Sequence, residues 1–188
     1  MSYDENLTSA TCPRMKKKTA IVYWLLLAKP ERDLFCDVVR ILRKELRAPN
    51  FEPHLTLFLT RNAGPRPKDV LRQLRARRIR LNVRGLAHSS KYTKTLYVRF
   101  KSSPALRKLA SEVARSAKTA AKPPTDPHVS LLYKKMAPRV KKELAAIIKL
   151  PFRSAVFDSI AAVRLTVPVR TGSDVEKWKI IARKSLRP

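Results

Sequence analysis

Apolar positions near the start of the chain change from a continuous run to a helical spacing. Residues 20–28 read AIVYWLLLA, and their β-branched and aromatic members favour a buried strand that ends before Pro30. Residues 31–46 then carry apolar side chains three and four positions apart, which predicts an amphipathic helix. Its apolar stripe comprises Leu34, Phe35, Val38, Val39, Leu42 and Leu46.

Prolines separate the elements of the middle of the chain. A strand over residues 54–60 follows Pro53, and a basic helix follows Pro67. Further strands are expected over residues 79–86, 95–100 and 128–133. Pro104 stands where the next helix would begin, because the first position of a helix tolerates proline.

The C-terminal part predicts one more helix and two strands. Pro138 opens the helix, whose buried side is expected to carry Val140, Leu144, Ile147 and Ile148. The strands are expected over residues 160–167 and 175–182, with a turn between them at residues 171–173. The elements together predict an α+β fold, in which a single domain over residues 19–188 follows a flexible basic tail of residues 1–18.

The N-terminal sequence has some features of a signal peptide. Three lysines at residues 16–18 precede the apolar run, but Asp4 and Glu5 lie upstream and no small-residue cleavage site follows. No apolar run reaches the roughly 18 residues that a membrane span needs. We therefore expect a cytoplasmic monomer with no membrane partner.

The charge of the chain predicts an anionic partner. Lys and Arg number 42 against 14 Asp and Glu, which gives a formal net charge of +28. The densest basic stretches are residues 16–18, 40–47 and 66–84. Such a field attracts polyanions and makes their binding sensitive to salt, so RNA, nucleotides and an anionic membrane surface all fit. The alternative is a charge that only keeps the surface solvated.

Composition excludes several kinds of site. Only 3 glycines are present, and neither of the usual glycine-rich phosphate-binding motifs occurs. Cys12 and Cys36 are too few for a disulfide framework or a cysteine-rich zinc site, and they suit a reducing compartment. The 3 histidines lack metal-ligand spacing, so no metal or other cofactor is expected.

Two of the histidines lie in closely similar segments. Each segment reads acidic-Pro-His-apolar-Ser/Thr-apolar, at residues 52–57 and 126–131. Alternate side chains of a strand share a face, so His54 and Thr56 should point one way while their apolar neighbours enter the core. The same holds for His128 and Ser130. Two half-units that face each other would place the histidines on opposite sides of a shared cleft, whereas two buried core histidines are the alternative.

A pair of imidazoles suits in-line displacement at phosphorus. One imidazole removes a proton from the attacking group and the other protonates the departing oxygen, both near neutral pH. The hydroxyls of Thr56 and Ser130 can donate hydrogen bonds to the phosphate oxygens as charge builds on them. Our working assignment makes His128 the base and His54 the acid, although the sequence does not decide between them.

At these residues the chain resembles the 2H phosphoesterase superfamily, whose signature is a pair of His-x-Ser/Thr-x motifs. The flanking residues are similar to its cyclic phosphodiesterase branch, which hydrolyses nucleoside 2′,3′-cyclic phosphates and ADP-ribose 1″,2″-cyclic phosphate. The similarity covers most of the chain and includes Trp24 and an ending that runs to Trp178. The resemblance implies a bilobal α+β fold, with two antiparallel sheets facing across a central cleft and helices outside.

The resemblance also implies roles for individual residues. His54 and His128 would be catalytic, Thr56 and Ser130 would bind the phosphate, and no cofactor would be needed. Trp24 and Tyr133 match family aromatics near the substrate, although Tyr133 can face the cleft only if the strand ends or bulges before it. Outside these six positions, Trp178 is expected to pack in the core and His88 to lie on the surface.

Several functions remain open from the sequence. The first is a metal-independent cyclic phosphodiesterase, and a variant is RNA end processing (tRNA included) or 2′-5′ RNA ligation by the same histidines. The strong positive charge departs from the family pattern and leaves the choice between a mononucleotide, ADP-ribose and an RNA end open. A non-catalytic basic RNA-binding module and a peripheral membrane or scaffold protein are the alternatives from other classes.

Overall fold

A computed structural model describes residues 17–61 and 64–188 of the chain. The expected tail, residues 1–18, lies outside the described residues except for its last two. Lys18 begins the first strand, and the Nζ of Lys17 forms an ion pair with the carboxylate of Asp174. In the described part of the chain, no helix combines the length and the apolar character that crossing a membrane requires.

Strands and helices alternate over the described residues. The strands are β1 (Lys18–Leu27), β2 (His54–Thr60), β3 (Ile79–His88), β4 (Leu96–Phe100), β5 (His128–Leu132), β6 (Ser154–Val167) and β7 (Lys179–Ser185). The helices are α1 (Glu31–Leu46), α2 (Pro67–Gln73), α3 (Pro104–Ser116), α4 (Pro138–Ile147) and α5 (Gly172–Glu176), with a 3₁₀ turn, η1 (Tyr92–Lys94).

All of these strands belong to one antiparallel sheet that closes on itself. Its order is β1-β2-β5-β4-β3-β6-β7, and β1 also pairs with β6, which completes a ring from which β7 extends. The expected α+β class is thus confirmed. The two facing sheets are, in detail, two sides of one continuous sheet, because β2 pairs with β5 at Leu55 and Val129, and β3 pairs with β6.

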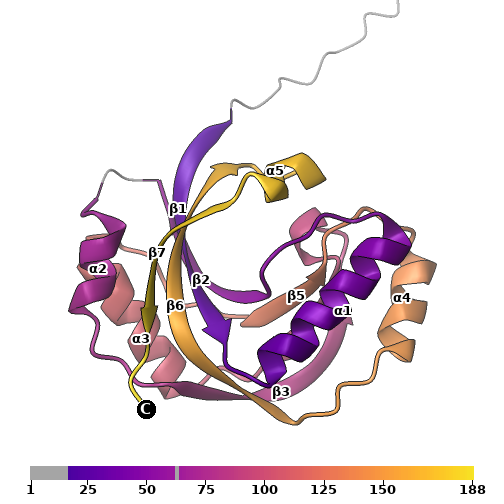
Figure 1. Ribbon diagram of the computed structural model, residues 1–188, viewed down its shortest axis with the longest axis horizontal. Coiled ribbons are helices and arrows are strands. Elements are labelled where there is room, and N and C mark those ends of the chain that lie inside the picture. Colours follow the sequence, from indigo (N-terminus) through magenta and orange to yellow (C-terminus); the bar gives the residue numbers. More distant parts are fainter. Residues whose placement is uncertain (1–16, 62–63) are drawn as a thin grey trace, which may run out of the picture.

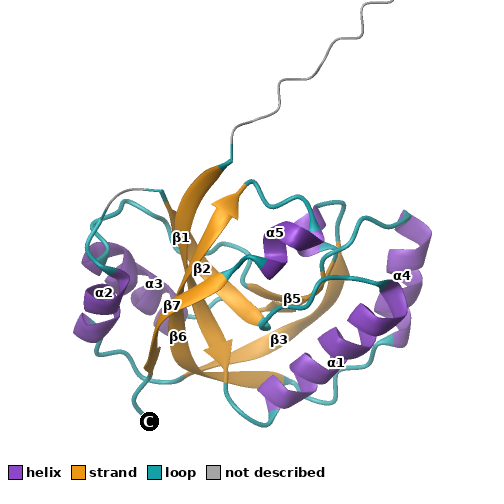
Figure 2. Ribbon diagram, turned by 45° about the horizontal axis from the view of Figure 1, so that its top comes forward, coloured by secondary structure: helices purple, strands orange, loops and turns teal. Residues whose placement is uncertain are grey.

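The helices pack on the outside of the ring in two groups. Helices α2 and α3 lie on one side, and α1 and α4 lie on the other, while α5 lies at the open end of the ring (Figures 1 and 2). Helix α3 contacts β2 and α1 contacts β5. The two strands that carry the histidine motifs therefore each have a helix behind them, and the opposite face of each strand is left for the interior of the ring.

Strand β1 is buried on both faces, which explains its uninterrupted apolar run. Tyr23 and Leu25 belong to the main core beneath the helices, whereas Val22, Trp24 and Leu26 pack with residues of β6 in a second cluster. A strand covered on both faces loses the alternation of polar and apolar residues that one exposed face would impose. Part of this second cluster lines the cavity described below.

Two expectations about the C-terminal part are wrong. Val175 lies in α5, and the last strand begins only at Lys179, because Thr171 and Asp174 form a capping box that starts a helix. Helix α4 does not bury the expected stripe: Val140 and Ile147 are 37% and 73% exposed, and Lys141 is buried instead. The Lys141 Nζ donates a hydrogen bond of 2.8 Å to the backbone carbonyl of Ser89, which gives the buried ammonium an acceptor.

Candidate active site

The two histidine motifs lie on neighbouring strands at the floor of a cleft. Leu55 of β2 pairs with Val129 of β5, and both side chains are fully buried in the main core. Alternation along antiparallel strands then places His54 across from Ser130, and Thr56 across from His128. The two imidazoles are diagonal neighbours, for which such a register gives about 7–8 Å between backbones. They share one floor of the cleft, whereas the two half-units expected from the sequence would have placed them on opposite sides of it.

His54 is held by a carbonyl and an aromatic ring. Its Nδ1 lies 2.6 Å from the backbone carbonyl of Glu52, two residues earlier. The ring of Trp24 stacks on the imidazole, with centroids 3.6 Å apart and planes 11° apart. The carboxylate of Glu52 is in turn fixed by Arg32, at 2.7 Å. His54 consequently has one defined position and a 6% exposed side chain.

His128 repeats this arrangement on the neighbouring strand. Its Nδ1 lies 2.8 Å from the backbone carbonyl of Asp126, again two residues earlier. The Asp126 carboxylate contacts Lys94 and, at 3.0 Å, Arg99. Burial acts to raise the pKa of Asp126, but the two cations outweigh it and the pKa is lowered. The acidic residue of each motif therefore orients its histidine through a carbonyl while basic side chains fix its carboxylate.

The carbonyl contacts determine where each histidine carries its proton. A carbonyl oxygen only accepts, so Nδ1 of both rings donates and Nε2 of the neutral rings keeps its lone pair. Burial lowers the pKa of His54 to about 3, assisted by the nearby His128 and opposed by the bond to Glu52. Burial also lowers the pKa of His128 below its usual value. Both imidazoles are thus mainly neutral at neutral pH and available as proton acceptors.

The two hydroxyls of the motifs differ in their surroundings. Thr56 is exposed to the cleft. Ser130 is buried, and its hydroxyl donates a hydrogen bond of 3.1 Å to the carbonyl of Thr93 in η1. Thr56 can donate to a bound anion directly, whereas Ser130 must first turn its hydroxyl away from Thr93.

Aromatic side chains form one wall of the cleft. Tyr133 follows the last residue of β5, so the end of the strand allows it to line the cleft. Its ring stacks on Phe51 at 4.1 Å, and burial raises the pKa of its hydroxyl. Trp178 contacts the rings of Trp24 and Tyr133 edge-on, at 5.3 and 5.7 Å, and also lines the cleft. Since His54 covers one face of Trp24, which is only 3% exposed, Trp24 supports the imidazole and offers a substrate little surface.

The cleft is large enough for a nucleotide and carries positive charge at its rim. Its volume is about 670 Å³, within the usual range of ligand sites. Lys94 of η1 and Lys91, which directly precedes η1, line the cleft. The Lys94 ammonium lies 4.4 Å from the centre of the Tyr97 ring. Among the described residues, no group of three or more His, Cys, Asp or Glu side chains is placed to hold a metal ion.

Some residues of the cleft were not found from the sequence. Lys91 and Lys94 lie between two predicted strands, and nothing in their spacing indicates that η1 folds over the floor of the cleft. Trp178 was expected to pack, and it does contact other rings, but it also lines the cavity. The acidic-Pro-His pattern was the available signal for the carbonyl contacts, because the residue before proline is confined to extended conformations. His88 is exposed at the end of β3 and does not line the cleft.

Comparisons with known proteins agree with this fold. The family model described as the 2′-5′ RNA ligase superfamily matches residues 33–167. The crystal structure of Escherichia coli LigT in its apo form superposes with a TM-score of 0.58 at 15% identity, covering 92% of this chain and 100% of that one. LigT complexed with 3′-AMP gives a TM-score of 0.53 at 13% identity, covering 90% and 99% of the two chains.

A further crystal structure, described as a phosphoesterase, gives a TM-score of 0.57 at 15% identity and covers 90% of this chain and 99% of its own. At these identities, the likeness to solved structures shows a shared fold. A comparison with curated proteins found no significant match.

Proposed function

Because this chain belongs to the 2′-5′ RNA ligase superfamily of 2H phosphoesterases, we propose that it is a cytoplasmic, metal-independent phosphodiesterase that opens a cyclic phosphate on a ribose. The observation that carries the proposal is the pair of imidazoles that line one cleft, each held through Nδ1 by a backbone carbonyl. The substrate is a nucleoside 2′,3′-cyclic phosphate, ADP-ribose 1″,2″-cyclic phosphate or the cyclic end of an RNA. LigT, a protein of the same fold, has been crystallised with 3′-AMP and with phosphate.

The proposed reaction needs one proton acceptor and one proton donor. Water attacks phosphorus while Nε2 of the first histidine takes its proton, and the bond from phosphorus to one ribose oxygen breaks. The second histidine, protonated at Nε2, gives its proton to that oxygen, so the products are a phosphomonoester and a free hydroxyl. Thr56, Ser130 and the rim lysines would stabilise the charge on the remaining phosphate oxygens.

The surroundings favour one assignment of these roles. The pKa of His54 is lowered to about 3, whereas that of His128 is lowered less, so His128 is the easier of the two to protonate. We therefore assign His54 as the base and His128 as the acid, the reverse of our working assignment from the sequence. Trp24 acts in this scheme as a positioning residue for His54, and Tyr133 as part of the substrate wall.

Substitution of the histidines tests the proposal. His54→Ala and His128→Ala should each reduce kcat for 2′,3′-cyclic nucleotide hydrolysis by about 10²-fold or more, because each removes one proton-transfer step. Turnover is measured by separating substrate from product chromatographically, in excess EDTA. His88→Ala, which changes an exposed histidine outside the cleft, is the matched control and should retain full activity.

Two outcomes would contradict the proposal. Near-normal turnover in either folded histidine variant would remove the two-histidine mechanism, and complete inhibition by EDTA would indicate a metal-dependent reaction. The same pair could serve RNA end processing or 2′-5′ ligation, which product analysis with an RNA bearing a cyclic end would reveal. Salt-sensitive RNA binding with no turnover and no effect of the substitutions would leave a non-catalytic RNA-binding module.

A further inference from the structure

A stripe of basic side chains runs along the exposed face of α1. Arg40, Arg43 and Lys44 follow one another at intervals of three and one, so they occupy one face of the helix, and Arg47 is the left-handed C-cap residue directly after its last turn. We call these four residues the α1 stripe. The opposite face of the helix is buried through Phe35, Val39 and Leu42.

The α1 stripe is largely free of anionic partners. Arg40 is paired with Asp37 at 2.8 Å, but both side chains are more than half exposed, so the pair is weak. The other three stripe residues are exposed and form no ion pair with another described residue. Three cations at the C-terminal end of α1 are thus available to an external anion.

The α1 stripe borders two hollows of the surface. The first, of about 590 Å³, is lined by all four stripe residues together with Ala48 and Glu176 of α5. The second, of about 220 Å³, shares Arg47, Ala48 and Glu176 with the first and adds the aromatic rings of Tyr92 and Tyr133. The two hollows are therefore contiguous and lead from α1 towards η1.

Tyr133 links these hollows to the catalytic cleft. It lines both the second hollow and the cleft, and Tyr92 lies between the cleft-lining residues Lys91 and Thr93. The ring of Tyr133 also packs in one cluster with Val39 of α1 and Val175 of α5. Tyr133 is only 3% exposed and stacks on Phe51, so the partly exposed ring of Tyr92 is the one that a ligand in these hollows can reach. A chain that leaves the cleft over η1 consequently reaches the ring of Tyr92 first and the α1 stripe next.

This order of groups matches the chemistry of a single-stranded nucleic acid. Bases stack on aromatic faces, and the phosphates that follow pair with a row of cations. We propose that the α1 stripe and the hollow beside Tyr133 bind the upstream nucleotides of an RNA whose cyclic phosphate end lies between His54 and His128. The inference rests on the proposed function and extends it, because it makes an RNA rather than a mononucleotide the substrate class.

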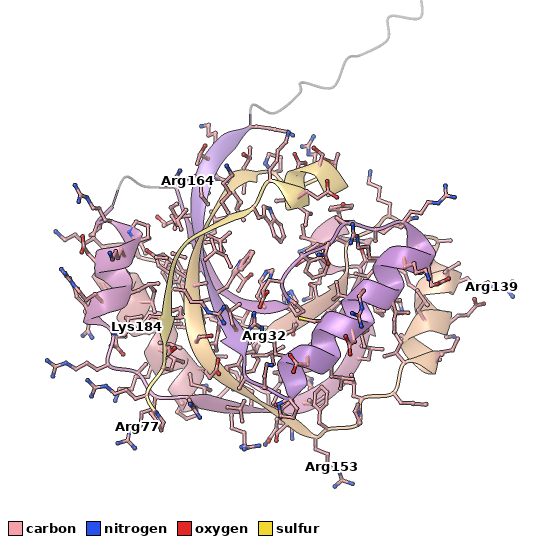
Figure 3. All side chains as sticks on the ribbon, in the orientation of Figure 1. Arg32, Arg77, Arg139, Arg153, Arg164 and Lys184 are labelled. Atoms are coloured by element: carbon pink, nitrogen blue, oxygen red, sulfur yellow. The ribbon has the colours of Figure 1, made fainter. Side chains whose placement is uncertain are left out.

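The charge of the molecule elsewhere provides a matched control. Figure 3 shows Arg77 and Arg153 pointing outwards, away from the ring interior and from the end of α1 that carries the stripe. Together with the exposed Lys108 of α3, they are three cations without an ion pair among the described residues. Removal of these three changes the net charge as much as removal of three stripe residues.

The experiment compares two triple variants on two substrates. Arg43→Gln/Lys44→Gln/Arg47→Gln should retain wild-type kcat/KM for a mononucleoside 2′,3′-cyclic phosphate but raise KM roughly tenfold or more for a short oligouridylate with a cyclic end. The salt dependence of its RNA affinity should also weaken, with a log–log slope smaller by about 2, since each phosphate contact on a single strand contributes about 0.7. Arg77→Gln/Lys108→Gln/Arg153→Gln should resemble the wild type on both substrates.

A single substitution that removes a negative charge is expected to increase RNA affinity. A gain of this kind cannot result from misfolding, so it tests the inference independently of folding. Glu176 is the carboxylate that faces both hollows, so Glu176→Gln should tighten RNA binding severalfold. Equal losses in the two triple variants, or an unchanged RNA affinity in Glu176→Gln, would overturn the inference. Loss of binding to phosphatidylserine vesicles with unchanged RNA turnover would assign the stripe to a membrane and overturn it as well.

The inference and the proposed function fail in different ways. If the wild type hydrolyses neither substrate, the proposed function fails. Anisotropy of a fluorescein-labelled oligouridylate with a 3′-phosphate then still measures RNA affinity at the α1 stripe and the hollow beside Tyr133 directly. A loss of RNA affinity in the stripe variant alone would support RNA binding by the α1 stripe even without hydrolysis. Equal RNA affinities of the wild type and both triple variants would refute the inference.

Discussion

At the scale of single residues, the sequence was most informative where a local rule sets geometry. Alternation along a strand was enough to place His54 and Thr56 on one face with Leu55 and Leu57 on the other, and the burial of the leucines agrees. The engagement of Ser130 with Thr93 could not be predicted in this way. It depends on how η1 folds over β5, which involves residues far apart in the chain.

The protonation of the two histidines predicts the pH dependence of the proposed enzyme. The base must be neutral and the acid protonated, and the pKa of each is lowered, to about 3 for His54. The protonated fraction of His128 therefore falls as pH rises above its lowered pKa, by up to about tenfold per pH unit. We expect kcat/KM for a cyclic nucleotide to decrease steadily from about pH 6 to pH 8.

The control for this profile is a substrate whose hydrolysis needs no acid. An analogue with a good leaving group, such as a p-nitrophenyl phosphodiester, should flatten the decrease because its departing oxygen requires no proton. A pH optimum above about 7.5 with the cyclic nucleotide would contradict the lowered pKa of both histidines and the roles derived from them.

At the scale of elements, local signals competed, and the structure shows which one prevails. The apolar spacing of residues 175–182 favoured a strand, but Thr171 and Asp174 cap a short helix before β7 can begin. In α4, the apolar side chains have the expected spacing, but no core packs against them, because that helix lies at the edge of the fold beside β3. Periodicity predicts that a helix forms but does not decide how much of it a neighbour will cover.

Helix α5 depends on a single carboxylate, which gives an element-scale prediction. Asp174 accepts hydrogen bonds from the backbone N–H groups of Arg170 and Thr171, at 3.0 and 3.1 Å, and pairs with Lys17. Asp174→Ala should lower the free energy of unfolding by about 1–2 kcal/mol. For a chain of this size, the midpoint of thermal unfolding should fall by roughly 2–8 °C.

The pH dependence of that loss provides its check. The bond from Lys17, followed by that from Arg170, lowers the pKa of Asp174 far below the usual 3.8. The stabilisation is therefore complete above the ordinary pKa and disappears as pH falls below it, so wild type and variant should converge in acid. Asp69→Ala, which removes an exposed ion pair with Arg72, should change the midpoint little at any pH. A constant difference down to about pH 2 would disprove the role of the carboxylate.

At the scale of the whole molecule, the closed ring was beyond what the sequence could predict. The repeated histidine motifs implied two similar halves, but ring closure requires β1 to pair with both β2 and β6, which no local pattern records. The similarity to known families gave the class of fold and the central cleft. The hydrogen bonding that joins its two sides into one sheet comes from the structure alone.

The net charge of +28 predicts opposite effects of salt on folding and on binding. Self-repulsion destabilises the compact chain, and added ions screen it, so the midpoint of thermal unfolding should rise between about 20 and 200 mM sodium chloride. RNA affinity should fall over the same range. The Arg77→Gln/Lys108→Gln/Arg153→Gln variant should show a smaller gain in stability, and a midpoint that decreases with salt in the wild type would contradict the repulsion.

The matching carbonyl contacts of His54 and His128 have a consequence for the direction of catalysis. Each contact fixes the same tautomer, so the tautomers leave either Nε2 able to accept or donate, and only the difference in pKa separates the base from the acid. Microscopic reversibility requires the two to exchange duties when a reaction runs backwards, and here the exchange needs only one proton to change sides. The same floor could therefore close a phosphodiester as well as open one, with the concentrations of water and of free ribose hydroxyl deciding the net direction.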